Sequence, residues 1–366
     1  MTRAHNKKVM VAMSGGVDSS VAAALMVEEG YDVTGVMLKL WKGDDINNSS
    51  GCCSVGAADD ARRVADVLDI PFYVLNFSER FGDTVVADFH SAYGRGETPN
   101  PCVRCNQWVK FGALLDRARS VGADALVTGH YARRRSYGDR YALLRGLDPR
   151  KDQSYVLWML DQDDLAHCLF PVGEMHKSET RAIAADLGLR TAAKPDSQEI
   201  CFVRNGDMDA YVDERMSAAA VPGAIVDRHG NTIGRHRGIG HYTVGQRKGL
   251  GVALGRPVFV TSIEAARNEI VIGPREQLAV GGFEGVEATF VNGAPGHELR
   301  VLVQHRAHGE IHPATVTPSS TGHLRVSYDD PVEAVAPGQS AAFYDGDEML
   351  GGAIISTTRA AVPAAS

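Results

Sequence analysis

Long apolar runs are missing from this chain of 366 residues. No stretch approaches the roughly 20 consecutive apolar residues that a transmembrane helix needs. The residues before Gly15 also lack the apolar core of a secretory signal peptide. These absences predict a soluble, cytoplasmic protein without a membrane partner. Because a chain this long exceeds one ordinary hydrophobic core, two or three domains are expected.

Cysteine is scarce, with six residues in the whole chain. So few thiols exclude the disulfide framework of a small secreted domain and favour a reducing compartment. The six are Cys52, Cys53, Cys102, Cys105, Cys168 and Cys201. A single Cys-x-x-Cys pair occurs, at Cys102 and Cys105, and no His-x3-His pair stands near it. A structural zinc site, which needs four ligands, is therefore disfavoured.

An excess of positive charge is also absent, since the formal net charge is −7 at pH 7. This value argues against a general nucleic-acid-binding protein, although the distribution of charge matters more than its sum. Between Arg235 and Arg256 the chain carries five basic residues and no acidic one, and Arg133 to Arg135 form a second basic cluster. The sequence therefore predicts a local basic face on an acidic protein.

Four apolar segments near the start of the chain have the composition of buried strands, and apolar residues at helical spacing lie between them. The segments are residues 7–14, 31–41, 70–77 and 123–130. This alternation predicts a parallel sheet covered by helices, in which ligands bind beyond the carboxyl ends of the strands. The functional loops should therefore follow Met13 and Trp41 and surround Gly129.

The rest of the chain changes character twice. Residues 131–146 are typical of a hairpin, and a helical region is expected from about Lys151 to Leu189, with Cys168 packed in it as a small hydrophobe. Beyond about Asn205 a short helix is followed by segments that alternate in polarity and are punctuated by glycine. These segments predict a small barrel or sandwich.

The turn after the first strand carries the strongest chemical signal, in the segment Ser14 to Ser20, SGGVDSS. Its two glycines let the backbone turn sharply, and the helix start presents N–H groups that suit an anion. The segment lacks the Gly-Lys-Ser/Thr ending of a Walker A loop. It resembles the SGGxDS loop of the PP-loop ATP pyrophosphatases, in which Asp18 would lie near magnesium and the triphosphate. Helix capping is the alternative role for Asp18.

Two further segments place polar residues near this edge of the sheet. Gly129 would let adenine or ribose approach the backbone, and His130 would stand at the mouth of the site and hydrogen-bond a substrate, unless it is an ordinary surface histidine. Lys151, Asp152 and Gln153 open a helix. Capping explains Asp152, while Lys151 and Gln153 have the chemistry to contact phosphate and base.

The cysteine pair has two further interpretations. A thioredoxin-like redox pair would open a helix directly after a strand, whereas this pair is expected in a bent loop after residues 94–101. Alternatively, one of the two cysteines acts together with the distant Cys201. A persulfide on one thiol and an attacking second thiol would transfer sulfur and leave a disulfide.

Six motifs together resemble the tRNA-specific 2-thiouridylase (MnmA) family over essentially the whole chain. They are SGGVDSS, PNPCVRCN, TGHYA, DPRKDQSY, SQEICF and GQRKGLG, in this order. The resemblance implies a PP-loop ATP-binding catalytic domain of α/β fold (1–205), a small central domain (206–280) and a C-terminal β-barrel (281–366). It also implies ATP-dependent 2-thiolation of the wobble uridine, position 34, of the glutamate, glutamine and lysine tRNAs.

The resemblance also assigns roles to individual residues. ATP, with Mg2+, would be held by Ala12, Met13, Ser14, Gly15, Gly16, Val17, Asp18, Ser19, Leu38 and Gly129. Cys105 would be the catalytic nucleophile and Cys201 the persulfide carrier. The target base would lie beside Asn100, Pro101 and Cys102, and tRNA would contact His130, Lys151, Asp152, Gln153, Arg306, Ala307 and Gln339. The implied partners are the tRNA anticodon stem-loop and a sulfur donor, either a cysteine desulfurase or a sulfur-relay carrier.

Two positions depart from the family pattern. Leu38 replaces a usual Met, which is a mild change for a residue that packs on a purine. Cys102 replaces an Asp that has been cast as a general base in many members, and a thiol cannot be assumed to serve that role. A set of three cysteines, Cys102, Cys105 and Cys201, also suits a [4Fe-4S] cluster with one open iron. Cluster-bound sulfide would then replace the persulfide.

The implied reaction begins with adenylation of the uridine C2 oxygen, because that oxygen is a poor leaving group until it carries AMP. Sulfur then attacks C2, after the base has left the anticodon stack. Two other classes of function remain open: a different PP-loop enzyme, such as an amidating synthetase, and a non-catalytic RNA-binding module. The amidating synthetase predicts a mild effect of Cys105→Ser, and the module leaves the complete PP-loop unexplained.

Overall fold

The structure is a computed structural model, and it describes residues 7–41, 55–196 and 200–361. Cys52, Cys53 and most of the predicted functional loop after Trp41 lie outside these ranges. The chain divides into two units. The first contains residues up to 85, 102–206 and 346–350, and the second contains residues 86–101, 207–345 and those from 351 onward. None of the described helices has both the length and the apolar character that a bilayer span requires.

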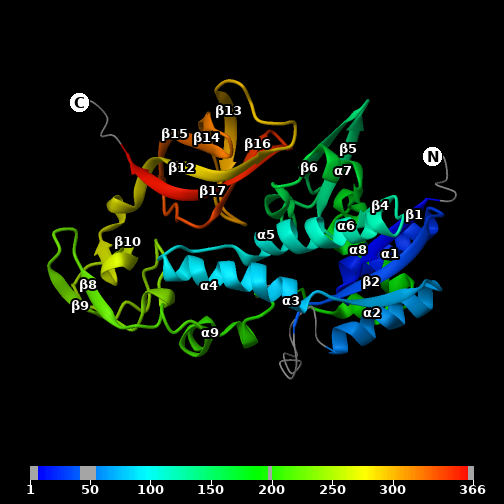
Figure 1. Ribbon diagram of the computed structural model, residues 1–366, viewed down its shortest axis with the longest axis horizontal. Helices are drawn as coiled ribbons and strands as arrows, with labels where there is room; N and C mark the ends of the chain where they lie inside the picture. The colour runs from blue at the N-terminus through cyan, green and yellow to red at the C-terminus, as the bar shows by residue number, and fades with distance from the viewer. Residues whose placement is uncertain (1–6, 42–54, 197–199, 362–366) are drawn as a thin grey trace. The chain divides into compact units, whose positions relative to one another are not determined.

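A five-stranded parallel sheet forms the centre of the first unit (Figure 1). Its strand order is β3-β2-β1-β4-β7. The strands are β1 (Lys8–Ala12), β2 (Asp32–Lys39), β3 (Phe72–Asn76), β4 (Ala125–Val127) and β7 (Cys168–Leu169). The four predicted strands are confirmed. The expected helix around Cys168 is wrong, because this residue lies in β7, a strand of two residues that is too short to show a periodicity.

The central strand β1 explains how the sheet is held together. Val9 and Val11 are fully or almost fully buried in a core that they share with helices α1 (Val17–Glu28), α2 (Val55–Leu68) and α8 (Lys177–Asp186). The edge strand β3 departs from the expectation of a buried strand, since Tyr73 is 58% and Val74 46% exposed. Among the described strands β3 pairs with β2 alone, so its apolar composition reflects strand propensity more than burial.

The cysteine pair lies in a helix, so the expected bent loop is wrong. Helix α5 (Pro101–Cys105) continues directly into a π-helix (Asn106–Leu114) and α6 (Leu115–Ser120). Proline suits the first turn of a helix because its missing N–H is not needed there. The pair therefore opens a helix, but it follows a loop rather than the strand that a thioredoxin-like motif requires.

The region after β4 contains shorter helices than the sequence predicts. The predicted hairpin is confirmed as β5 (Ala132–Tyr137) and β6 (Arg140–Arg145). The helical region of residues 151–189 consists of short pieces around β7, and α8 is its longest helix. The others are a 3-10 turn (Ser154–Leu157), α7 (Gln162–Ala166) and a second 3-10 turn (Pro171–Glu174). Asp161 starts α7 by accepting a hydrogen bond from the Asp164 amide, and Pro171 occupies the first position of the second 3-10 turn, where its missing N–H is not needed.

The second unit contains a β-barrel, which decides between the barrel and the sandwich. The strand order is β12-β15-β14-β13-β16-β17, and β12 pairs with β17, so the barrel closes without a free edge. The strands are β12 (Ala279–Phe290), β13 (Leu299–Gln304), β14 (Ile311–Ser320), β15 (His323–Glu333), β16 (Ser340–Asp345) and β17 (Glu348–Ala360). Val303, Val326 and Phe343 are fully buried inside it.

The second unit also contains a four-stranded sheet, of order β10-β11-β8-β9. Its strands are β8 (Gly223–Val226), β9 (Thr232–His236), β10 (Phe259–Glu264) and β11 (Glu269–Gly273). The predicted short helix is confirmed as α9 (Met208–Arg215), and α4 (Ala87–Gly94) belongs to the same unit. Alternating apolar residues such as Val260, Ile270 and Ile272 supply the buried face of the sheet.

A glycine of the barrel holds the segment that leads to the cysteines. Gly338 has φ +87, and a Cβ atom added to it would lie 2.8 Å from Glu97 Cβ and 2.9 Å from the Thr98 nitrogen. Thr98 donates its amide hydrogen to the Pro337 carbonyl at 2.8 Å. Only glycine satisfies both the left-handed conformation and this close approach.

Replacement of Gly338 by alanine should therefore be more damaging than the same change at a matched site. Gly322 also has a positive φ (+72) but has no atom near the added Cβ. We expect Gly322→Ala to cost about 1–2 kcal/mol from backbone strain, and Gly338→Ala about 1–3 kcal/mol more from overpacking. Thermal unfolding of both variants measures the difference. Equal losses in the two variants would contradict the close packing of residues 97 and 98.

Candidate active site

The PP-loop lies where the sequence places it, between β1 and α1. Ser14 is exposed and Gly16 is half-buried, whereas Met13 and Val17 belong to the apolar core, so only the backbone of these last two is available to a ligand. The loop is closed by Ser19, whose Oγ accepts the Ser14 amide hydrogen at 3.1 Å and donates to the Gly16 carbonyl at 3.2 Å. The first N–H groups of α1 have no side-chain cap, and this leaves the anion-binding end of the helix open.

Two glycines allow neighbouring segments to approach this loop. Gly15 has φ +69, and an added Cβ would lie 2.2 Å from the Ala57 carbonyl oxygen of α2. At Gly129 an added Cβ would lie 2.6 Å from the Ser19 nitrogen and 2.7 Å from the Asp18 carbonyl carbon. The segment after β4 is therefore pressed against the first turn of α1, as the shared sheet edge predicts. Leu38 is buried near the carboxyl end of β2.

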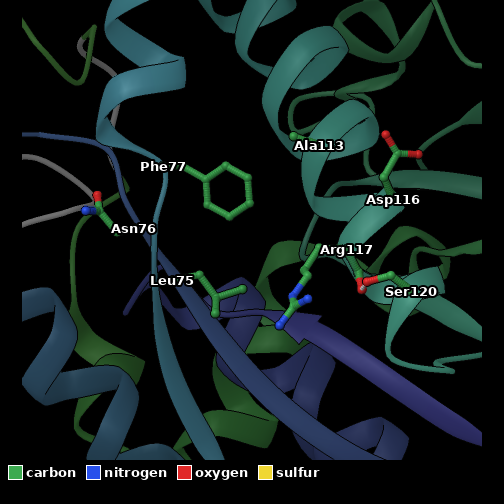
Figure 2. A pocket seen from close by; sticks show the side chains of 7 residues that line it. All are labelled: Leu75, Asn76, Phe77, Ala113, Asp116, Arg117 and Ser120. Atoms are coloured by element: carbon green, nitrogen blue, oxygen red, sulfur yellow. Dashed lines mark hydrogen bonds between the residues drawn. The ribbon is translucent and has the colours of Figure 1, made fainter.

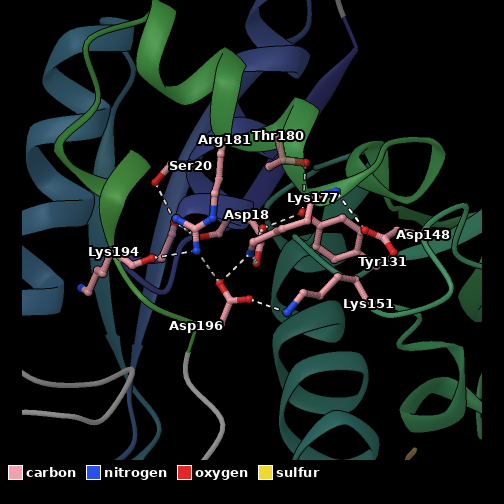
Figure 3. A network of polar contacts seen from close by, with 12 residues as sticks. Asp18, Ser20, Tyr131, Asp148, Lys151, Lys177, Thr180, Arg181, Lys194 and Asp196 are labelled. Atoms are coloured by element: carbon pink, nitrogen blue, oxygen red, sulfur yellow. Dashed lines mark hydrogen bonds and ion pairs between the residues drawn. The ribbon is translucent and has the colours of Figure 1, made fainter.

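Asp18 is held by two side chains from distant parts of the chain (Figure 3). Lys177 Nζ contacts Asp18 Oδ1 at 2.7 Å and Oδ2 at 2.8 Å, and the Tyr131 hydroxyl donates to Oδ1 at 2.8 Å. Tyr131 is buried, and its hydroxyl oxygen also lies 3.0 Å from Thr180 Oγ1. Burial, and then the negative charge of Asp18, raise the pKa of Tyr131 well above its usual value, so the hydroxyl remains a donor.

Asp196 forms the second centre of this network. Its Oδ1 contacts Lys177 Nζ at 2.8 Å and Arg181 Nη2 at 2.9 Å, while its Oδ2 accepts from Lys151 Nζ at 2.7 Å. Burial alone would raise the pKa of Asp196, but the hydrogen bonds from Lys151 and Lys177 outweigh burial and lower it to about 2. A further cation, Lys194, contacts the Gly15 carbonyl at 2.9 Å.

The sequence interpretation missed Lys177, Arg181, Lys194 and Asp196. Lys177 and Lys194 lie 159 and 179 positions from the PP-loop residues that they contact, so no local pattern marks them. Arg181 and Asp196 join them through contacts with Lys177 and Lys194. The single available signal was the position of Asp196, five residues before Cys201 in the segment that carries the SQEICF motif. Four cations therefore lie beside the phosphate-binding loop of an acidic protein, paired with nearby carboxylates. They are Lys151, Lys177, Arg181 and Lys194.

His130 lies in a different environment from the one expected. It is buried rather than exposed at the mouth of a site, and its ring packs near those of Phe111 and Phe170, with centroids 5.7 and 6.4 Å away. Its Nδ1 is 2.7 Å from the Thr128 hydroxyl. Burial, and then the positive charge of Lys110, hold the pKa of His130 well below its usual value, so the ring is neutral.

The three residues Lys151, Asp152 and Gln153 all contact the protein itself. Asp152 Oδ1 accepts the Ser154 and Gly146 amide hydrogens at 3.0 and 2.9 Å, although the N-cap residue of the 3-10 turn is Gln153 and not Asp152. Gln153 forms two hydrogen bonds with the backbone of Tyr131. Its Oε1 accepts the Tyr131 amide hydrogen at 3.0 Å, and its backbone amide donates to the Tyr131 carbonyl at 2.8 Å. Gln153 therefore fixes the loop that brings Tyr131 to Asp18.

Helix α3 (Ser78–Phe81) contacts both cysteine-bearing segments. Phe202, which follows Cys201, packs with Phe81 and Trp41, at centroid distances of 6.0 and 5.7 Å. Arg80 Nε donates to the Trp108 carbonyl at 3.2 Å, in the helical series that contains Cys105. Cys105 is buried, Cys201 is half-buried and Cys102 is exposed. Since Trp41 follows β2, the Cys201 segment lies at the carboxyl end of the sheet, as the PP-loop does.

Two metal groups were expected, Mg2+ and an iron–sulfur cluster, and the described side chains suit Mg2+. Asp18 is a partly exposed carboxylate at the phosphate-binding end of α1, which suits Mg2+ bound with a triphosphate. For the iron–sulfur set the geometry gives no support. Within residues 7–41, 55–196 and 200–361, which include Cys102, Cys105 and Cys201, no three His, Cys, Asp or Glu side chains are grouped to hold a metal ion.

Three of the residues expected to contact tRNA, namely Arg306, Ala307 and Gln339, lie in the second unit. Gln339 Nε2 donates to the Thr98 carbonyl at 2.6 Å, next to the Asn100–Pro101 segment. The Arg306 side chain donates to the Ala334 carbonyl at 2.7 Å, and Gln304 holds the Arg306 and Ala307 carbonyls at 3.0 Å each. The chain thus presents Ala307 on a fixed turn.

Two hollows occur away from these residues. A pocket of about 500 Å³ in the first unit is lined by Leu75, Asn76, Phe77, Ala113, Asp116, Arg117 and Ser120 (Figure 2), and none of the expected ATP-binding residues lines it. A second hollow, of about 350 Å³, is lined by residues of the glycine-rich basic segment, including Arg247 and Arg256. In this second hollow, the two cations Arg247 and Arg256 line one concave surface formed by the segment between β9 and β10.

Comparison with known families gives three matches in chain order. Residues 7–205 match the tRNA methyl transferase HUP domain, residues 209–274 the tRNA methyl transferase PRC-barrel domain, and residues 281–355 the aminomethyltransferase beta-barrel domain.

Curated relatives match nearly the whole chain. The protein of Roseiflexus sp. (strain RS-1) named tRNA-specific 2-thiouridylase MnmA is 47% identical and covers 94% of this chain and 98% of its own length. Proteins of the same name from Geotalea uraniireducens and Moorella thermoacetica are 46% and 48% identical, each covering 94% of this chain, and 94% and 98% of their own lengths.

The neutral, buried His130 should make stability depend on pH. Its pKa is lower in the folded than in the unfolded chain, so the unfolded chain binds the extra proton first as the pH falls below about 6.5. Stability should then decrease by up to about 1.4 kcal/mol per pH unit. His130→Leu should remove this contribution, whereas replacement of the exposed His297 by Gln should not. Denaturant unfolding between pH 7 and 5 tests this, and identical pH slopes for His130→Leu and the parent chain would contradict it.

Proposed function

Because this chain belongs to the tRNA-specific 2-thiouridylase (MnmA) family, we propose that it replaces the C2 oxygen of the wobble uridine, position 34, of the glutamate, glutamine and lysine tRNAs with sulfur. The chain is a tRNA sulfurtransferase with a PP-loop ATP-binding fold. The supporting observation is that the PP-loop and the Cys201 segment lie at the same end of one parallel sheet.

In addition, we propose a division into domains at 1–205, 206–280 and 281–366.

ATP activates the uridine in the first step. The C2 oxygen attacks the α-phosphorus, the bond to the β-phosphate bridging oxygen breaks, and pyrophosphate leaves. The open N-terminus of α1 and the lysines around Asp196 favour the negative charge that develops on this leaving group. Mg2+, when bound, would neutralise part of the triphosphate charge beside Asp18. At Gly16 an added Cβ would meet only Ser14 Oγ, at 3.4 Å, so the backbone there leaves room for the nucleotide.

Sulfur transfer forms the second step. The terminal sulfur of a persulfide on Cys201 attacks C2, and AMP leaves with the former uridine oxygen. The Cys105 thiolate then attacks Cys201 Sγ, the sulfur–sulfur bond breaks, and its electron pair remains on the sulfur bound to C2. A Cys105–Cys201 disulfide is left for an external dithiol to reduce. The common attachment of both cysteine segments to α3 supports this pairing.

Recognition of tRNA would involve both units. Lys151 and the neighbourhood of His130 in the first unit, and Asn100, Ala307 and Gln339 in the second, provide the proposed contacts with the anticodon stem-loop. The basic residues from Arg235 to Arg256 suit backbone phosphates. The proposed source of sulfur is a cytoplasmic cysteine desulfurase or a sulfur-relay carrier, since the persulfide on Cys201 would have to be formed again for each turnover.

Serine variants of the two cysteines test the proposal. Cys105→Ser and Cys201→Ser should each lower single-turnover thiolation of tRNA by at least about a thousandfold, because either change removes a sulfur that the relay requires. Binding of ATP, measured by calorimetry, should remain within a few fold. Cys168→Ala, at a buried cysteine in β7, provides the control. Full activity of both serine variants would eliminate the thiol relay and leave an amidating type of PP-loop enzyme.

Cys102 and the cluster alternative need a separate experiment. We propose that Cys102 lies beside the target base, so Cys102→Ala should reduce turnover without removing bound sulfur from Cys201. Anaerobic purification followed by visible absorption and iron analysis decides about the [4Fe-4S] cluster. A colourless, iron-free protein that thiolates tRNA from a persulfide donor supports the relay. Stoichiometric iron that is lost in Cys102→Ala would replace the relay with cluster-bound sulfide.

A further inference from the structure

Both carboxylate oxygens of Asp18 are in contact with one ammonium group. Lys177 Nζ lies 2.7 Å from Oδ1 and 2.8 Å from Oδ2, and Oδ1 also accepts the Tyr131 hydroxyl. A metal ion on Asp18 would have to approach the same two oxygens. The two cations would repel each other strongly at such a separation in a partly buried site. The position of Lys177 is therefore incompatible with a metal bound at both Asp18 oxygens.

The surroundings hold Lys177 in this position from several sides. Its side chain is 11% exposed, and Nζ lies 5.6 Å from the centroid of the Tyr131 ring. The backbone amide of Lys177 donates to Asp148 Oδ2 at 3.2 Å, which fixes the first turn of α8. Such a buried ammonium is stable only while it keeps an anionic partner.

Asp196 is a second anionic partner of Lys177, so the lysine can leave Asp18 without losing every ion pair. Its Oδ1 lies 2.8 Å from Lys177 Nζ, so a small rotation of the lysine side chain can release Asp18 while one ion pair is retained. Lys151 and Arg181 also contact Asp196, and they would limit how much negative charge Asp196 offers to Lys177. An incoming phosphate would provide the remaining negative charge.

We propose that Lys177 is a positioning residue that competes with Mg2+ for Asp18, so that the metal enters the site together with ATP and not alone. With ATP present, the phosphates attract Lys177, and Asp18 becomes a ligand for the metal of Mg·ATP. The enzyme thereby avoids trapping a divalent cation at the PP-loop when no nucleotide is bound. This inference rests on the proposed ATP-dependent function, and it names a residue that controls the order of binding.

Binding of Mn2+, followed by electron paramagnetic resonance, tests the inference directly. Without nucleotide, the parent chain should bind Mn2+ weakly at this site, and Lys177→Met should bind it at least about tenfold more tightly. The double variant Asp18→Asn/Lys177→Met should return to weak binding. With the ATP analogue AMPCPP, the parent chain should gain Mn2+ affinity by more than Lys177→Met does, because the competition has already been removed in the variant.

Lys194→Met is the matched control. Lys194 also lies beside the PP-loop, but it contacts the Gly15 carbonyl and Asp60 rather than Asp18. Removal of this charge should change Mn2+ affinity by less than about threefold, because it relieves only a weak, screened long-range repulsion between Lys194 and the metal. An equal gain in Lys194→Met and Lys177→Met would overturn the inference, since it would mean that net charge alone controls the metal.

Stability supplies a second readout in case Lys177→Met folds poorly. Loss of the lysine leaves Asp18 and Asp196 facing each other, and Mn2+ should raise the unfolding temperature of Lys177→Met but not that of the double variant. The parent chain is decisive by itself: tight Mn2+ binding without nucleotide that is lost in Asp18→Asn would overturn the inference. These measurements need neither tRNA nor sulfur, so a failure of thiolation is recognised separately.

Discussion

The close approach of Gly129 to the first turn of α1 is the contact on which the site depends. A side chain at this position would collide with the backbone of Asp18 and Ser19. Because the two segments touch, the loop that follows β4 runs directly past the PP-loop, and Tyr131 reaches Asp18 with its hydroxyl. Gln153 then holds the backbone of Tyr131 from the opposite side. One missing Cβ atom thus allows three separate segments to share a single phosphate-binding region.

Helix α3 would perform a similar task for the proposed sulfur chemistry. It has only four residues, yet Arg80 contacts the helical series of Cys105 and Phe81 contacts the residue after Cys201. A relay between two thiols requires that both segments keep a common reference, because sulfur–sulfur chemistry is sensitive to the direction of attack. Phe81 packs against Trp41 and Phe202, and Arg80 donates a hydrogen bond to the Trp108 carbonyl, so this one short helix contacts both segments.

Charge is distributed so that an acidic protein still offers a cationic site. The overall charge is −7, but Lys151, Lys177 and Arg181 surround the carboxylate of Asp196. Paired in this way, the lysines and the arginine can be held close together at a tolerable electrostatic cost. A polyphosphate can then be met by cations that are already positioned, which reduces the reorganisation required when it binds.

The sequence by itself determined the local features of this protein. The parallel strands β1, β2, β3 and β4, the PP-loop and the hairpin could be predicted, because each depends on neighbouring residues and on short periodicities. Tertiary structure alone decided two other matters. It buried His130 among aromatic rings, and it brought Lys177 and Asp196 together beside Asp18. These outcomes depend on contacts between residues far apart in the chain, and no local pattern records such contacts.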